Sequence, residues 1–239
     1  MVKKAESESK ELTSWQQAIA ADAKKVAHNE GTDSSAIKIQ HGMMMYHDQP
    51  VPNNELDVII VASVSENCFY KGKYDADKIS SPDCFAQGLE PTGLIPHENV
   101  LEPINSDCDT CPNNEFGSAG KGKACKNYRK LIFIPANTLA EDVPKAEMAY
   151  MKVSPTSVNN WRKYAQQLVG SAGIPPWAAY TKVKVVPDKK TIHQIQFHGI
   201  GPIEDQEILA AVHARIESAE AKLLQPYTYE EEEEDSGKY

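Results

Sequence analysis

The segment Leu56-Asp-Val-Ile-Ile-Val-Ala-Ser-Val64 continues to Tyr70 as one long run of β-type residues. Valine and isoleucine fit the pleated surface of a strand, so this run predicts a β core. Upstream, the stretch from Ala36 to Tyr46 alternates and is rich in Ile and Met. The turn-forming residues Pro50-Val51-Pro52-Asn53-Asn54 separate the two segments. We therefore predict that residues 36–46 and 56–70 form a long antiparallel hairpin.

Further strands are predicted downstream of this hairpin. Residues 131–134 and 149–153 have strand character. Residues 180–186 and 191–198 flank the turn Pro187-Asp188-Lys189-Lys190 and predict a second hairpin. The chain thus contains about five or six strands.

Helical spacing of apolar residues marks three helices. The first runs from about Ser14 to His28, and the second begins near Thr156 or Ser157 and continues past Leu168. The third carries a stripe from Leu209 to Leu223 and ends before Pro226. Between the strands, residues 80–124 show little periodicity but many Pro, Gly, Asn and Cys. A connection of that length normally serves a function or is held in place by a crosslink.

These elements predict a mainly β (α+β) fold. An OB-like Greek-key barrel satisfies the pattern, with the cysteine-containing segment as an insertion and helices on either side. Other small antiparallel β domains with flanking helices also fit. We predict three parts: an N-terminal tail and helix at 1–30, an OB-like domain at 31–225 with an insertion at about 80–128, and a disordered acidic tail at 226–239.

The composition of the chain limits the cellular compartment in which the protein is expected. Hydrophobic content of 41% and charged content of 25% are ordinary for a globular protein. No apolar run approaches the roughly 20 residues of a membrane span. The charged start, Met1 to Lys10, lacks the apolar core of a secretory signal. We therefore expect a cytoplasmic protein, in which five cysteines, an odd number, are not disulfides.

The cysteines suggest a metal. Cys108-Asp-Thr-Cys111 is a C-x-x-C pair, and two thiolates at that spacing can bind one zinc ion from a tight turn. Cys84 and Cys125 complete a four-thiolate set with no open position, as in structural zinc sites. His97 competes with Cys84 as the fourth ligand, whereas Cys68 lies within a predicted strand and is interpreted as a packing thiol. A redox pair or unrelated thiols are the alternatives, but the flanking Asp and Pro residues indicate a loop.

Two segments combine cations and aromatic rings, the mixture that holds phosphates and stacks bases. Lysines in a loop are usually only solvated, and aromatics in strands usually belong to the core. The nucleic-acid interpretation gains weight from the presence of both segments beside the cysteine cluster. The candidate contacts are Lys121, Lys123, Lys126, Tyr128, Arg129, Lys130 and Phe116 in the first segment, and Phe69, Tyr70, Lys71, Lys73 and Tyr74 in the second.

The C-terminal tail carries a block of like charge that accounts for more than half of the formal net charge of −9. Such a block predicts a disordered segment that binds basic partners or only aids solubility. The candidate partner-binding residues are Glu230, Glu231, Glu232, Glu233, Glu234 and Asp235.

Motifs of enzymes are not found in this chain. The Gly-Lys-Gly-Lys stretch is not a phosphate-binding loop, because the full spacing of that motif is missing. We find no hydrolase or metalloprotease motif either. We therefore expect no enzymatic activity.

The text Cys108-Asp-Thr-Cys-Pro-Asn-Asn-Glu-Phe-Gly-Ser118, followed by Gly120-Lys-Gly-Lys-Ala-Cys125, resembles a zinc insertion of phage-encoded proteins. The layout of the chain resembles the single-stranded DNA-binding proteins of tailed bacteriophages, in particular the zinc-containing helix-destabilising protein of T-even phages. That family has a mixed His and Cys site, so the ligands are not carried over to the four cysteines of this chain.

The resemblance implies an OB fold and cooperative coating of single-stranded DNA in replication or recombination, hence self-association along the strand. It also implies contacts of the acidic tail with replication proteins in the host cytoplasm. Two rival hypotheses remain: a zinc-containing interaction module that acts on a polymerase or host factor without binding DNA, and a zinc-dependent nuclease with an open metal position.

Overall fold

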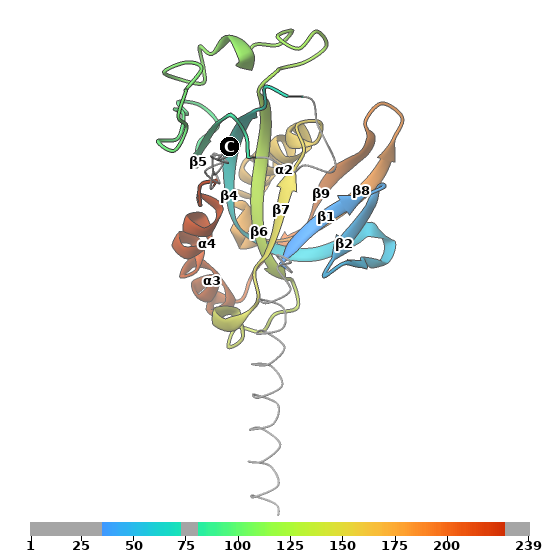
Figure 1. Cartoon of the computed structure of the whole chain (residues 1–239). Coiled ribbons are helices and arrows are strands. Elements are labelled where there is room, and N and C mark those ends of the chain that lie inside the picture. The colour runs from blue at the N-terminus through green and yellow to red at the C-terminus, as the bar shows by residue number, and fades with distance from the viewer. Residues whose placement is uncertain (1–34, 73–80, 228–239) are drawn as a thin grey trace, which may run out of the picture.

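The Val- and Ile-rich run forms β4 (Glu55–Phe69), a strand of 15 residues around which the sheet is ordered. The computed structural model describes residues 35–72 and 81–227. Within these residues the chain is mainly β, as the sequence predicted, and its sheet is strongly curled into a half-barrel (Figure 1). The strands other than β4 are β1 (Ala36–Gln40), β2 (Met43–Tyr46), β3 (Gln49–Pro50), β5 (Cys84–Gly88), β6 (Lys126–Pro135), β7 (Ala149–Val153), β8 (Ala179–Asp188) and β9 (Ile192–Pro202).

The strand order is β3-β2-β1-β7-β6-β4-β8-β9, and β5 pairs with β4 outside this path. The β1–β7 pair is parallel and the other pairs are antiparallel. The strands are joined by long loops and by short 3-10 helices: η1 (Pro52–Asn54), η2 (Pro112–Asn114), η3 (Val143–Lys145) and η4 (Pro176–Ala178).

The inner face of the curled sheet encloses the first apolar core. Ile37 and Met44 from the β1–β2 end share one buried cluster with Val183 and Ile195 from the β8–β9 end. Strands that are far apart in the sheet order therefore meet across the curl. The helix α2 (Val158–Ala172) packs against the same cluster.

The start of helix α2 also provides hydrogen-bond partners for backbone groups at the outer edge of β9. The backbone N–H of Ile195 donates to the Ser157 hydroxyl at 2.9 Å, and the Asn160 amide donates to the Ile195 carbonyl at 2.9 Å. The predicted start of this helix near Ser157 is confirmed, and Gly173 ends it in the left-handed conformation with φ 64°.

The outer face of the sheet carries a second core beneath the C-terminal helices. The prediction of one final helix was wrong: the stripe is divided between α3 (Gln206–His213) and α4 (Ile216–Leu223). The chain breaks at Ala214-Arg215, where the Arg215 guanidinium donates to the carbonyls of Val143 and Ala146 at 2.5 and 2.8 Å. These tertiary bonds hold the break in place, and Val212 and Leu223 still face the same core.

The predicted pairing of residues 36–46 with 56–70 was also wrong. Residues 36–46 fold on themselves as the β1–β2 hairpin, because His41 and Gly42 both adopt positive φ and reverse the chain. Strand β4 pairs with β5, β6 and β8. By contrast, the predicted hairpin of 180–186 with 191–198 is confirmed as β8–β9, and the short strand 149–153 is β7.

One further prediction is corrected by the structure, and others concern residues that the structure does not describe. The segment 80–124, predicted as irregular, contains the strand β5. The predicted helix 14–28 and the contacts Lys73 and Tyr74 lie outside the described residues. None of the helices in the described ranges has both the length and the apolar character needed to cross a membrane.

The acidic tail also lies beyond the part of the chain that the structure describes, which ends at Tyr227. The prediction of a partner-binding run therefore stays a prediction. It concerns Glu230, Glu231, Glu232, Glu233, Glu234 and Asp235, all of which lie outside the described residues.

Candidate functional site

The residues from Cys84 to Cys125, here called the cysteine lobe, lie between the end of β4 and the start of β6. The lobe begins as β5, which pairs with the last residues of β4, and then continues as a loop that projects beyond the sheet (Figure 1). Its two ends are therefore fixed by strand pairing, which places Cys84 opposite Phe69 and Cys125 directly before β6.

Backbone and side-chain hydrogen bonds shape the C-x-x-C turn. The Asp107 carboxylate accepts from the Thr110 backbone at 2.8 Å and from the Thr110 hydroxyl at 2.6 Å. The Cys108 N–H donates to the Leu94 carbonyl at 2.8 Å. No helix begins at Cys108, and within the lobe only the short η2 follows Cys111. The turn is therefore held by an aspartate rather than by a helix N-terminus.

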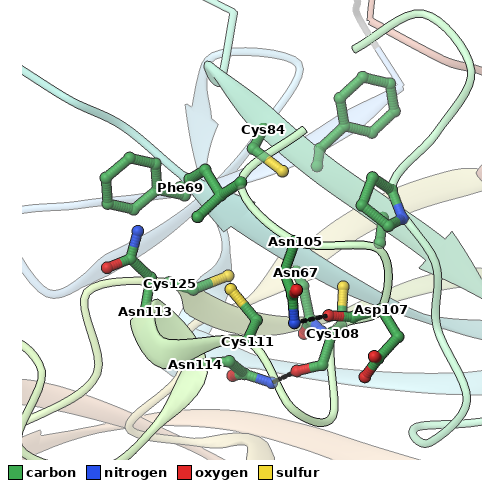
Figure 2. A pocket seen from close by; sticks show the side chains of 14 residues that line it. Asn67, Phe69, Cys84, Asn105, Asp107, Cys108, Cys111, Asn113, Asn114 and Cys125 are labelled. Carbon is green, nitrogen blue, oxygen red and sulfur yellow. Dashed lines mark hydrogen bonds between the residues drawn. The ribbon is translucent and has the colours of Figure 1, made fainter. Parts of the chain in front are cut away.

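The four cysteines predicted as ligands come together around one small cavity. The cavity measures about 10 Å³, and Cys84, Cys108, Cys111 and Cys125 all line it. Figure 2 shows their sulfur atoms turned toward the shared space, with the Asn114 amide bonded to the Cys108 carbonyl at 2.7 Å beneath them. In the part of the chain that the structure describes, however, no group of three or more Cys, His, Asp or Glu side chains is arranged so that it could hold a metal ion.

The protonation of the thiols follows from their surroundings. Burial, together with the neighbouring thiols, raises the pKa of Cys125 to about 12. Burial likewise raises the pKa of Cys108, with Cys84 and Cys111 acting in the same direction and a hydrogen bond involving Asn67 opposing it. Four mutually close thiols cannot all ionise unless a cation neutralises them, and a bound metal deprotonates its cysteine ligands.

His97, the alternative fourth ligand, is placed elsewhere. Its ring stacks on Phe85 with centroids 4.9 Å apart, and its Nδ1 accepts from the Asn99 backbone at 3.1 Å. It does not line the cavity of the four cysteines. Cys68 is fully buried on β4 and contacts Phe85 in a small cluster of its own. The geometry therefore favours Cys84 over His97 and keeps Cys68 apart.

Several of the predicted DNA contacts are exposed cations. Lys121 is exposed and Lys123 is half-buried in the lobe, and Lys126 is exposed at its base. Lys123 donates to the Asn114 side-chain oxygen at 3.1 Å and Lys126 donates to the Lys123 carbonyl at 2.5 Å, so both have neutral partners. Within residues 35–72 and 81–227, none of these lysines forms an ion pair.

The predicted aromatic contacts are spread over the lobe and the end of β4. Phe116 is 82% exposed on the loop of the lobe. Tyr70 is 37% exposed, and Phe69 lines the cysteine cavity. Next to Tyr70, the Lys71 ammonium lies 3.6 Å from the Glu102 carboxylate, so its charge is partly neutralised.

Three predicted contacts on β6 point to opposite faces of the sheet. Lys130 is only 7% exposed and its ammonium lies 3.3 Å from the Glu66 carboxylate, so it is buried away from any ligand. Tyr128, on the same face, lies beneath the Lys152 ammonium, which is 4.1 Å from the ring centroid. Arg129 faces the other side, because successive residues of a strand alternate. The structure therefore separates residues that the sequence grouped together.

A buried ionic cluster surrounds Glu66, which is completely inaccessible to solvent and which sequence analysis missed. The Lys152 ammonium contacts its carboxylate at 2.5 Å, the Gln87 amide donates to it at 2.9 Å, and the Tyr227 hydroxyl donates to it at 3.0 Å. Lys130 is the fourth partner. A lone Glu within a strand run carries no local signal, because its partners lie on β5, β6, β7 and the segment after α4.

Stability should fall at acid pH through Glu66. Burial opposes ionisation of this carboxyl, but Lys152, Lys130 and the hydrogen bond from Gln87 lower its pKa from 4.5 to about 2. Since the pKa of the folded state is depressed, the stabilisation is complete above pH 4.5 and is lost as the pH falls toward 2. Urea unfolding of the Glu66→Gln variant should show a smaller decline over this window than the unmodified chain. Equal slopes for the two proteins would contradict this assignment.

Comparison with known proteins adds no assignment to this geometry. No family model, no curated protein and no solved structure matches this chain. The residues of the cysteine lobe and of the sheet are therefore the basis for the function proposed below.

Proposed function

We propose that this protein coats single-stranded DNA with little sequence specificity and performs no chemistry. The observation that carries the proposal is the contrast between two sets of cations. Four lysines of β6, β7 and β8, namely Lys130, Lys152, Lys182 and Lys184, each form an ion pair with a carboxylate. The cations from 121 to 129 have none within the described residues. They also lie close in sequence to the exposed Phe116, whose ring is available to stack on a base.

The strand order supports an OB-type barrel as the fold of this proposal. Four strands lie in the order β8-β4-β6-β7, in which the fourth strand returns by a long connection to lie beside the first, as in a Greek key. That connection contains α2, and β9 pairs with β8 as a fifth strand. In OB folds the second and third strands and the loop between the first two bind oligonucleotides. The cysteine lobe occupies that loop, whereas the far edge of β7 is taken by β1.

We propose that one zinc ion binds Cys84, Cys108, Cys111 and Cys125. Four thiols around one cavity match the donor set of structural zinc. The thiols would lose their protons to solvent, and their sulfur atoms would have to close around the ion. Zinc would supply a crosslink between β5, the C-x-x-C turn and the start of β6, and thereby fix the position of Phe116 and the lysines. The site would have no open position for catalysis.

In this proposal the exposed aromatics Phe116 and Tyr70 stack bases, and Lys121, Lys123, Lys126 and Arg129 neutralise phosphates. Lys130 and Tyr128 are left out because the Glu66 cluster occupies them. If the resemblance to phage proteins holds, this activity takes place in the cytoplasm of a host cell. The acidic tail would recruit replication or recombination proteins through Glu230, Glu231, Glu232, Glu233, Glu234 and Asp235.

Salt dependence tests the proposal. Binding of labelled oligo-dT, followed by fluorescence anisotropy, should be submicromolar at low salt and weaken steeply as salt rises. The slope of log affinity against log salt is about −0.7 for each phosphate neutralised on a single strand. The double variant Lys121→Glu/Lys126→Glu should weaken binding at least about tenfold and flatten that slope, since each lost phosphate contact reduces it.

The matched control is Lys145→Glu/Lys222→Glu, which changes the charge equally with two exposed lysines on η3 and α4. This control should change affinity less than the lobe variant. Equal losses in both variants would mean that net charge, and not the lobe, governs binding. Failure of the unmodified chain to bind at low salt would favour the protein-interaction module.

A further inference from the structure

Arg129 is a partly buried cation that forms no ion pair among the described residues, and the carboxylate of Glu90 acts on it only through its charge. The Nη1 atom donates to the Leu89 carbonyl at a long 3.5 Å, and Nε is buried with no hydrogen-bond partner in the described part of the chain. A guanidinium has five N–H donors, so most of those of Arg129 have no protein acceptor within the described residues. Burying a charge without compensation is costly, and the buried Lys130 and the half-buried Lys152 both have a carboxylate. The exception at Arg129 suggests a ligand.

The register of the sheet locates this guanidinium. Arg129 lies between Ser65 of β4 and Val153 of β7. On the same face of the sheet, two positions toward the lobe, lies Asn67, which lines the cysteine cavity, and two positions in the other direction lies Leu131 of the inner core. Arg129 thus marks the boundary between the cysteine lobe and the inner core of the half-barrel.

A second arginine, Arg162, follows the buried Trp161 on α2, a helix that packs against β6 and shares the inner core with Leu131. Burial lowers the pKa of Arg129, the nearby Glu90 opposes this effect, and the charge of Arg162 adds to it. Arg162 is exposed and, like Arg129, forms no ion pair within the described ranges. Two arginines that repel one another are stabilised together when an anion lies between them.

We infer that Arg129 and Arg162 form a seat for one phosphodiester group of a single DNA strand, between the cysteine lobe and α2. The inference rests on the proposed function and adds the path of the strand: it passes beside β6 toward α2, rather than running only over the lysines of the lobe. A guanidinium fork matches a phosphate with two parallel hydrogen bonds, which a lysine cannot reproduce.

The test uses oligo-dT anisotropy on the full chain. Arg129→Gln and Arg162→Gln should each weaken binding about tenfold and reduce the salt slope by about 0.7, as expected for one lost phosphate contact. The double variant should weaken binding by less than the product of the two single-variant factors, because both residues hold the same phosphate group. Arg129→Lys should also weaken binding while keeping most of the salt slope. Lys163→Gln, an exposed neighbour on α2, should change affinity less than about twofold.

Thermal melting separates a ligand seat from a structural role. Removing an unpaired, partly buried charge should leave the melting temperature of Arg129→Gln equal or higher while affinity falls. A loss of both stability and affinity in Arg129→Gln, together with unchanged affinity in Arg162→Gln, would overturn the seat. The seat would also be overturned if Arg129→Gln and Arg162→Gln bound oligo-dT as tightly as Lys163→Gln does. If the unmodified chain does not bind oligo-dT, the proposed function itself fails.

Discussion

Replacement of Glu66 by Ala should lower the free energy of unfolding by about 3–5 kcal/mol, the cost expected when one partner of a buried ion pair is removed. The substitution would leave the ammonium groups of Lys152 and Lys130 without their carboxylate, and the hydroxyl of Tyr227 without this acceptor. Because the hydroxyl of Tyr227 joins the segment after α4 to the Glu66 cluster, that segment should loosen as well. Urea denaturation followed by far-UV circular dichroism would measure the effect.

The matched control is Glu102→Ala, which removes the carboxylate from the exposed pair with Lys71. Exposed ion pairs contribute little, so the unfolding midpoint of this variant should barely move. Equal midpoints for the Glu66→Ala and unmodified proteins would show that water reaches the cluster and replaces the carboxylate. Hydrogen exchange at Tyr227 and its neighbours would then show no increase either.

Removal of the proposed zinc ion should unfold the cysteine lobe while the half-barrel keeps its fold. Structural zinc contributes apparent binding free energies of about 10–16 kcal/mol in zinc-finger peptides, far more than the small clusters of the lobe can replace. Apart from Cys108 itself, those clusters bury only Ala86 and Leu94 on one side, and Cys68, Phe85 and Val100 on the other. A strong chelator or Cys108→Ser should release about one zinc ion per chain, abolish exchange protection in the lobe and weaken DNA binding.

Metal content measured by mass spectrometry gives the decisive comparison. Cys84→Ser should lose the metal like Cys108→Ser, because His97 stacks on Phe85 and lies outside the cavity. Cys68→Ser is the matched control: it also alters a buried thiol but should keep one zinc ion per chain. A protein purified without zinc that melts at the same temperature as the zinc-loaded form would rule out a structural metal.

Local sequence patterns were sufficient where neighbouring residues determine the structure. The β8–β9 hairpin, the start of α2 at Ser157 and the mainly β character followed from turn residues, apolar spacing and β-branched runs. The grouping of the four cysteines also followed from spacing, since a C-x-x-C pair and two flanking cysteines can reach one point from a loop whose ends lie on strands that pair with β4.

Other features depended on which strands became neighbours. The pattern of residues 36–46 is compatible with several partner strands. Only the assembled sheet shows that β1 pairs with β7, whereas β4 pairs with β5, β6 and β8. The break between α3 and α4 depends on carbonyls about 70 residues away from Arg215. A single segment carries no periodic signal for contacts of this kind, because the partner residues lie on distant elements.

By itself, the sequence determined the β-rich class, the cysteine lobe and the cluster of cations beside it, because these follow from composition and short spacings. The tertiary structure decided the roles of adjacent residues on β6. Lys130 is neutralised by Glu66, whereas Arg129, one residue away, faces the other side of the sheet and has a buried Nε without a partner among the described residues. The physical reason is that a strand alternates its side chains between two faces, and only the neighbours on each face determine whether a charge is paired inside the protein or left for a ligand.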